Sequence, residues 1–468
     1  MTGDGTMSID WGDGSPVETH SLSVDDAAYR HHSYHAPMIH TVTIAGENIT
    51  ELNCSYSGIT HLDVSRNSAL TKLNCHYNRL TELDVSNNTA LKELDCSWNT
   101  LTDLNMSRNA ALTKLVCERN QLTNLDVSKN TAMIHLDCYC NQLSSLDVRH
   151  CTALTNLICG WNELTGLDVS NNTALKELDC AENPSLTNLG VSKNVMLEEL
   201  NCCYCGLTNL DINANPALKT LDCSVNNLTN LDVSASTALA ELNCSENGLS
   251  KLDVNANSAL VKLDCSVNLL SSLDVSANIA LTELNCGNAL YHQKYRNQLT
   301  SLDVSANASL TVLCCNKNRL KRLDVSANIE LKELNCSENQ LKNLNVSKNK
   351  RLTKLNCSEN RLSKIDVNNN TELKHLNLEN NCLTQLDVSN HTMITHVNIT
   401  RNEFSTDALN DLVGMLPSGS KLSSWDDGHY RTEPVGQIFI SDNPGAENFT
   451  ECLARNKGWE LDDPIAVW

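Results

Sequence analysis

The stretch LTKLNCHYNRLTELDVSNNTA, residues 70–90, is followed directly by LKELDCSWNTLTDLNMSRNAA, residues 91–111, in the same pattern. The pattern recurs through most of the 468 residues at a spacing of 21, with one extra residue at Pro184–Ser185 and a longer interruption after Cys286. Successive copies start at Ile49, Leu70, Leu91, Leu112, Met133, Leu154, Leu175, Leu197, Leu218, Leu239, Leu260, Leu281, Leu310, Leu331, Leu352 and Leu373, and a partial copy starts at Ile394. Sixteen whole tandem copies predict a repeat solenoid, which lengthens without needing a wider core.

The order of residue types inside one copy predicts the local structure. Counted from Leu70, the copy has Leu at positions 1, 4, 11 and 14, Cys at position 6, Asn at positions 9 and 19, and Val at position 16. Apolar residues at positions 4 and 6 predict a short strand with two inward side chains, and the copies are expected to stack as a parallel ladder about 4.8 Å apart. The Asn at position 9 is expected to bond backbone groups of the turn that no strand partner reaches.

The pattern L-x-x-L-x-C-x-x-N-x-L resembles the conserved segment of leucine-rich repeats. With LDVSxNxA as its other half, the chain is similar to internalin-J-like cysteine-ladder proteins and to related surface proteins of Bacteroidetes, over roughly residues 49–403. The resemblance implies a right-handed superhelix with a parallel β-sheet on the inner face, short turns on the outer face and little helix. It also implies surface adhesion or partner binding as the role.

Residues 1–48 are expected to cap the open end of the solenoid with β-structure. Ser8–Trp11 and His40–Ile44 are predicted strands, and Gly12–Ser15 is typical of a tight turn. The strings IDWGDGS, HHSYH and HTVTIAG are similar to the end of a PKD-type β-sandwich, which would be partial here because its opening strands are missing. Three histidines suggest a metal site as the alternative, but a structural role at a strand edge is favoured. They are His31, His32 and His35.

Residues 404–468 are expected to form an α/β cap at the other end, similar to the C-terminal cap of the Bacteroidetes proteins. Ser405 is in a position to cap a helix through the apolar residues that follow it. Gln437–Ile440 predicts a strand, and Ala446–Asn456 predicts a second helix.

Fifteen of the 22 cysteines occupy position 6 of the repeat and are expected to point inward, one above the next. We interpret them as reduced thiols, because side chains of in-register parallel strands project the same way and suit disulfide torsions poorly. Free Cys packs as a small hydrophobe, so a 21-residue turn can close around a thin core. The fifteen are Cys54, Cys75, Cys96, Cys117, Cys138, Cys159, Cys180, Cys202, Cys223, Cys244, Cys265, Cys286, Cys315, Cys336 and Cys357.

Two patterns suggest metal sites, and in both the structural interpretation is favoured. The closely spaced pairs Cys138/Cys140 and Cys202/Cys205 have no second pair at zinc-finger spacing. An Asp recurs at position 15, as in Asp63 and Asp84, and a calcium ladder is conceivable. Calcium requires six to eight oxygens for each ion, however, and capping of local N–H groups is the simpler explanation. No metal and no cofactor is therefore expected.

Composition and motifs exclude several classes of function. The net charge of −21 and the absence of a basic run argue against nucleic acid and against anionic membrane surfaces. No apolar run is long enough to span a membrane, and the first residues do not read as a signal peptide. No phosphate loop, HExxH, nucleophile elbow or paired-acid signature occurs in a supporting context, so an enzyme is not expected.

Position 8 of the repeat lies where the inner strand ends and core packing does not dictate identity. In a chain that is 4% aromatic, the first eight repeats carry a concentrated aromatic stripe there, to which position 7 adds Tyr139. Aromatic and Arg enrichment is typical of interface hot spots, whereas mutual stabilisation of stacked rings is the structural alternative. The predicted binding residues of this stripe are Tyr56, Tyr77, Trp98, Arg119, Tyr139, Trp161 and Tyr204.

A second irregularity is an insertion at residues 287–296, GNALYHQKYR, where two residues are expected. Its basic and aromatic residues Tyr291, His292, Lys294 and Tyr295 extend the predicted binding surface, because insertions in repeat arrays often lie on the binding face. A tolerated surface insertion is the alternative.

The sequence thus favours a non-enzymatic binding protein, a secreted or surface-exposed bacterial adhesin-like module that acts as a monomer and recognises a host or microbial protein. Two alternatives stay open. Aromatic platforms also stack on sugar rings, which would make the chain a glycan-binding module. An intracellular effector or scaffold would account for reduced thiols and for the missing signal peptide.

Overall fold

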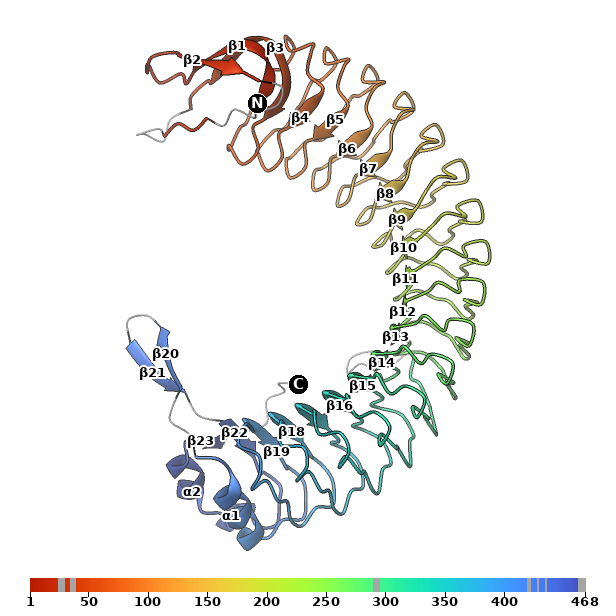
Figure 1. The fold of residues 1–468 in the computed structure, drawn as a ribbon, viewed down its shortest axis with the longest axis vertical. Helices are drawn as coiled ribbons and strands as arrows, with labels where there is room; N and C mark the ends of the chain where they lie inside the picture. Colours follow the sequence, from red (N-terminus) through yellow and green to blue (C-terminus); the bar gives the residue numbers. More distant parts are fainter. Residues whose placement is uncertain are drawn as a thin grey trace. The chain divides into compact units, whose positions relative to one another are not determined.

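The computed structural model describes residues 1–23, 30–33, 39–288, 295–418, 422–426, 429–433 and 436–461, with the backbone alone for 422–426 and 429–433. The chain forms two compact units, Met1–Leu218 and Lys219–Trp468. Each is an array of stacked turns with one short strand per turn and little helix, so the predicted repeat solenoid with a parallel sheet is confirmed (Figure 1).

The N-terminal unit starts with a short antiparallel sheet that continues into the repeats. Strand β3 pairs antiparallel with β1 and parallel with β4, so it belongs both to the cap and to the first repeat. The predicted strand Ser8–Trp11 lies in β1 as far as Asp10, whereas of the predicted strand His40–Ile44 only Thr43 and Ile44 lie in β3. The strands of this unit are β1 (Thr2–Asp10), β2 (Glu18–Leu22), β3 (Thr43–Asn53), β4 (Lys72–Asn74), β5 (Glu93–Asp95), β6 (Lys114–Val116), β7 (His135–Asp137), β8 (Asn156–Ile158), β9 (Glu177–Asp179) and β10 (Glu199–Asn201).

The C-terminal unit continues the same repeat. Its strands pair in parallel and in register, with the position-4 leucines opposite one another, as in Leu242 and Leu263. They are β11 (Thr220–Asp222), β12 (Glu241–Asn243), β13 (Lys262–Asp264), β14 (Glu283–Asn285), β15 (Val312–Cys314), β16 (Glu333–Asn335), β17 (Lys354–Asn356), β18 (His375–Asn377) and β19 (His396–Asn398).

The C-terminal cap extends this ladder and covers its end. Strand β22 pairs in parallel with β19 and with β23, and β20 and β21 form a separate antiparallel hairpin. The predicted helix cap is confirmed, because the Ser405 side chain accepts a hydrogen bond from the Ala408 N–H. The elements are α1 (Thr406–Met415), β20 (Leu422–Asp426), β21 (His429–Glu433), β22 (Gly436–Phe439), a 3₁₀ turn η1 (Ala446–Asn448), α2 (Glu451–Asn456) and β23 (Trp459–Leu461).

One element of the cap differs from the prediction. A single helix over Ala446–Asn456 is wrong, because Phe449 has an extended backbone (φ −67°, ψ 142°) that separates η1 from α2. The Phe449 side chain is buried at this break, which explains why the chain leaves the helical path there.

The core of each turn consists of the leucines, the Val at position 16 and the Cys at position 6. The ladder cysteines from Cys75 onward are fully buried, as the predicted cysteine ladder requires. Burial raises the pKa of the Cys336 thiol to about 12 and that of Cys117 well above its usual range. In the last two repeats position 6 is taken by the buried Leu378 and Ile399, so the ladder ends before the cap.

Two columns of side-chain donors hold the turns together. At position 9, the Asn120 amide donates to the carbonyls of Cys96, Cys117 and Glu118 and accepts from the Leu101 N–H, at 3.0–3.3 Å. The expected role of this Asn is confirmed, since the amide reaches backbone groups in two successive turns. At position 19 a second column of Asn side chains donates to carbonyls of the preceding turn only, as when Asn109 donates to Val85 and Asn88.

Candidate functional site: an aromatic ladder

The residues at position 8 share a backbone conformation that sequence analysis missed. Outside the repeat that carries the insertion, each has a positive φ, for example 53° at Tyr56, 54° at Tyr77 and 52° at Trp98. Left-handed backbone costs a residue with a Cβ roughly 1 kcal/mol and is cheapest for Gly or Asn. The signal was hidden because this column is filled with Tyr, Trp, Arg, Glu and Val, none of which favours that conformation.

Six side chains of the N-terminal unit form one continuous stack, here called the aromatic ladder. The ring centroids of Tyr56 and Tyr77 are 4.5 Å apart, and those of Tyr77 and Trp98 are 5.5 Å apart. The Arg119 guanidinium carbon lies 4.3 Å from the Trp98 ring centroid and 5.9 Å from that of Tyr139. The ladder comprises Tyr56, Tyr77, Trp98, Arg119, Tyr139 and Trp161.

Tyr139 bridges a gap in the column. Position 8 of its repeat is Cys140, and the ring that continues the stack comes instead from position 7, with its centroid 6.3 Å from that of Trp161. The ring lies against Gly160, where a Cβ would come within 3.2 Å of Tyr139 Cδ2 and 3.0 Å of the Ala181 carbonyl. The absence of a side chain at residue 160 therefore makes room for this rung.

The ladder is exposed along most of its length. The exposed fraction is 68% for Tyr56, 42% for Trp98 and 52% for Trp161. The Trp98 indole N–H donates to Glu118 at 3.0 Å, which fixes the ring while leaving it accessible. Tyr204 lies in the same column and is also exposed, but Glu182 separates it from Trp161.

The inserted segment belongs to the C-terminal unit, and only its base is described. Asn288 accepts from the Asn297 N–H at 2.9 Å and donates to the Lys317 carbonyl at 2.7 Å, which anchors both ends of the insertion. Tyr295 is half-buried, whereas Tyr291, His292 and Lys294 lie outside the described residues. Their assignment to a binding surface stays a prediction.

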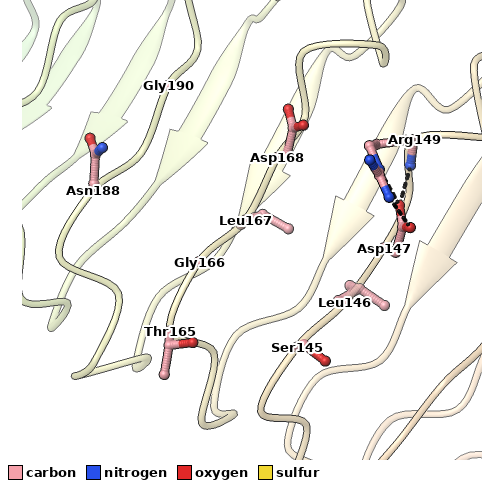
Figure 2. Close-up of a pocket in the computed structure, with 10 residues that line it drawn as sticks. All are labelled: Ser145, Leu146, Asp147, Arg149, Thr165, Gly166, Leu167, Asp168, Asn188 and Gly190. Carbon is pink, nitrogen blue, oxygen red and sulfur yellow. Dashed lines mark hydrogen bonds and ion pairs between the residues drawn. The ribbon is translucent and has the colours of Figure 1, made fainter.

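On the outer face, the turns of three successive repeats line an open hollow of about 600 Å³ (Figure 2). It exists because Gly166 and Gly190 carry no side chains there. Its carboxylates are already engaged, because Asp147 pairs with the Arg149 guanidinium at 2.8 Å and Asp168 caps the Ser170 N–H at 3.0 Å. The predicted capping role of the position-15 column is confirmed at these residues.

Of the three histidines named from the sequence, His32 has structural partners and His31 is exposed. His32 bonds Asp13 at 2.7 Å and stacks on Trp11 with ring centroids 4.9 Å apart, which agrees with the structural interpretation. His35 lies outside the described residues. Among the side chains that the structure describes, no group of three or more His, Cys, Asp or Glu residues is arranged to hold a metal ion. No helix in the described ranges is long and apolar enough to cross a membrane.

Comparison with known proteins identifies the family. Neither a scan against protein-family models nor a search of curated proteins gives a match. Among solved structures, the functional domain of InlJ from Listeria monocytogenes, described as including a cysteine ladder, is 36% identical, with a TM-score of 0.67 over 73% of this chain and 76% of that one.

Two further structures share the fold alone. A leucine-rich-repeat protein of Leptospira interrogans is 23% identical, with a TM-score of 0.64 over 79% of this chain and 94% of that one. The plant peptide hormone receptor RGFR1, solved in complex with RGF2, is 19% identical, with a TM-score of 0.64 over 86% of this chain and 73% of that one. On its repeat, its buried thiols and its likeness to InlJ, the chain belongs to the internalin-like leucine-rich-repeat proteins that contain a cysteine ladder.

Proposed function

We propose that the chain is a non-enzymatic binding scaffold, a secreted or surface-exposed bacterial adhesin-like module that binds a protein partner through the aromatic ladder. Its membership of the family that includes the Listeria domain supports the bacterial and internalin-like part of this proposal. The plant receptor solved with RGF2 is a precedent, at the level of the fold, for binding on such a solenoid.

The observation that carries the proposal is the exposure of the ladder at backbone positions unfavourable to its residues. Stacked aromatic pairs contribute about 0.5–1.5 kcal/mol each. Left-handed backbone costs roughly the same at each rung that stands at position 8, which is every rung except Tyr139. The two effects approximately cancel, so stability alone does not explain why Trp98 and Trp161 stand there half-exposed. Large rigid rings with exposed faces are the anchors that protein interfaces use.

The test measures attachment of the labelled full chain to cultured epithelial cells. A Trp98→Ala and Trp161→Ala double variant is expected to lose at least about 90% of the bound label, because hot-spot rings dominate interface energy. Its melting temperature should fall by only a few degrees, because both side chains are about half-exposed. A Glu246→Ala and Glu359→Ala double variant changes the same repeat position in the other unit and should bind like the wild type. Equal loss in both double variants would place the site elsewhere.

The exposed rings also favour a second candidate, a glycan partner, because sugar rings stack on such platforms. Two treatments of the target cells separate the candidates. Protease treatment should abolish attachment to a protein partner, and mild periodate oxidation of the cell-surface sugars should leave it intact. The reverse result assigns the ladder to a glycan.

A further inference from the structure

A stripe of carboxylates runs beside the aromatic ladder on the same strand-bearing face. At position 5, the paired strands β5 to β9 alternate acidic and aliphatic residues in direct register. Neighbouring strands are about 4.8 Å apart, so successive carboxylates are separated by about 9.6 Å. The column reads Asp95, Val116, Asp137, Ile158 and Asp179.

The outer two carboxylates have partners within the protein. Asp95 accepts from the Ser97 hydroxyl at 2.6 Å and pairs with His76 at 3.5 Å. Asp179 accepts from the Asn201 amide at 3.1 Å and from the Ala181 N–H at 3.0 Å. Both therefore have much of their hydrogen-bonding capacity filled.

Asp137, at the centre of the stripe, differs from both. Its Oδ1 accepts from the Tyr139 N–H at 3.1 Å, and no side chain in the described ranges donates to it. The residues on either side of it in the column, Val116 and Ile158, have no polar side-chain atoms. Burial, together with the Glu118, Asp179 and Asp95 carboxylates, raises the pKa of Asp137 to about 6, although the hydrogen bond from the Tyr139 N–H lowers it. Among the described side chains, none with a positive charge is within ion-pair distance of Asp137.

The ladder itself shows how a cation lies on this surface. The Arg119 guanidinium packs between the Trp98 and Tyr139 rings, as a cation does over an aromatic face. The rings of Tyr56, Tyr77 and Trp161 also remain partly exposed, so cationic or apolar groups of a partner can pack against them.

We propose that the aromatic ladder and the carboxylate stripe together bind an extended cationic peptide segment in the polyproline II conformation, with Arg or Lys at every third residue. The proposal rests on the ladder being the binding surface. The cations would lie on Asp95, Asp137 and Asp179, and the intervening residues would pack on the rings.

The spacing of the stripe selects this conformation. A polyproline II helix has three residues per turn and rises about 3.1 Å per residue, so every third side chain lies on one face about 9.3 Å from the last. A β-strand repeats a face after about 6.6 Å. An α-helix returns to the same face after seven residues, about 10.5 Å, and drifts out of register by about 2 Å over the three carboxylates. Polyproline II also presents flat prolyl surfaces that aromatic grooves bind.

The experiment titrates the full chain with a capped heptapeptide, Arg-Pro-Pro-Arg-Pro-Pro-Arg, by isothermal calorimetry at pH 7. Its three cations match the stripe over about 19 Å. A control of the same composition, Arg-Pro-Arg-Pro-Arg-Pro-Pro, places them on different faces and should bind at least about tenfold more weakly. A heptapeptide with Glu in place of Arg should not bind. Equal affinity of the two arginine peptides, or binding of the glutamate peptide, overturns the proposal.

A matched pair of variants identifies the contact. Asp137→Asn keeps the acceptor for the Tyr139 N–H but removes the charge, and should weaken the spaced peptide about tenfold, as loss of one partly buried charge pair does. Asp264→Asn makes the same change at position 5 of the other unit and should leave the affinity unchanged. An equal effect of both variants, or of neither, overturns the assignment to Asp137.

The cell-attachment assay separates this proposal from the proposed function. If no arginine peptide binds while the tryptophan double variant still loses attachment, the peptide specificity is wrong and the ladder remains the binding surface. If the tryptophan double variant binds both cells and peptide normally, the ladder is not the surface and both proposals fall.

Discussion

The strand-bearing faces of the N-terminal and C-terminal units have the same backbone and different chemistry. In strands β11 to β14 of the C-terminal unit, position 5 alternates Asp with Asn, and each amide bonds the carboxylate beside it, as Asn243 does for Asp222 and Asn285 for Asp264. In the N-terminal unit, Val116 and Ile158 stand where those amides would be. Position 8 carries stacked rings in one unit and mostly Glu, Val and Lys in the other, at the same positive φ. The difference shows that the fold requires neither the aromatic ladder nor a carboxylate without a side-chain donor, such as Asp137.

The largest expected effect concerns the position-9 Asn, which both units share. Asn120 and Asn339 each donate to three carbonyls and accept from one leucine N–H, at 2.9–3.3 Å. Asn120→Ala and Asn339→Ala should each lower the free energy of unfolding by about 3 kcal/mol or more, because buried carbonyls lose their donors. Urea denaturation followed by hydrogen exchange checks this. A loss of stability for only one of the two variants would show that the position-9 Asn does not play an equivalent role in both units.

The next effect concerns the thickness of the core. Cys117→Leu and Cys336→Leu should each cost about 1–3 kcal/mol, because added bulk strains closely stacked turns, whereas Cys→Ala at the same sites leaves a void that costs about 1 kcal/mol. Denaturant midpoints of the four variants provide the comparison. Leu already occupies position 6 at residue 378, in the second-last turn before the cap. If Cys336→Leu is as stable as the wild type, the core of the interior turns is no thinner than that of the turn that contains Leu378.

Asp137 should destabilise the free protein, in contrast to its counterparts in the other unit. Its folded pKa of about 6 exceeds the ordinary value of 3.8, so the folded state holds more protons between pH 4 and 6 and the free energy of unfolding falls as pH rises through that window. Asp137→Asn should therefore raise the free energy of unfolding at pH 7 by on the order of 2 kcal/mol, and should remove its decrease between pH 4 and 6. The charged and titratable side chains nearby are Asp95, Lys114, Glu118, Arg119, His135, Tyr139, Glu177 and Asp179.

The control for that prediction is Asp264→Asn, which removes a carboxylate bonded by Asn285 at 2.8 Å and by the Ser266 hydroxyl at 2.6 Å. It should lower the free energy of unfolding slightly, by less than about 1 kcal/mol. Thermal denaturation from pH 4 to 8 measures both variants. A destabilised Asp137→Asn variant would show that this carboxylate supports the fold.

The smallest effect tests the backbone of position 8. Val225 has φ 53°, which a β-branched residue adopts at a cost, and Asn tolerates it better. Val225→Asn should raise the free energy of unfolding by roughly 1 kcal/mol. Trp98→Asn should change it little, because relief of backbone strain is offset by the loss of stacking on Tyr77 and Arg119. Stabilisation of both variants by the same amount would mean that the stack adds nothing to the fold.

The fold was predictable from the sequence because its determinants repeat. Leu at position 4 and Cys at position 6 are buried in nearly every turn, and one copy suffices to place the strand. The contacts within the ladder were not predictable. The positive φ at Tyr77 leaves no mark in residue type, and Tyr139 lies close against residue 160, where Gly leaves room for its ring. The raised pKa of Asp137 depends on residues of the strands on either side of it. These neighbours can be identified only once the register of the strands is known.

The cysteine ladder also affects how the chain reaches its folded state. Thiol–disulfide exchange requires a thiolate, and in the stacked turns burial raises the pKa of the Cys117 and Cys265 thiols well above its usual range, which leaves them inert at neutral pH. Before the turns stack, the same thiols have ordinary reactivity and can cross-link at random. In an oxidising compartment, correct folding therefore depends on whether the turns stack faster than their thiols are oxidised. Each turn that docks buries one more thiol and so removes one more nucleophile that could be oxidised. The protection is therefore kinetic, and it grows with the length of the stack.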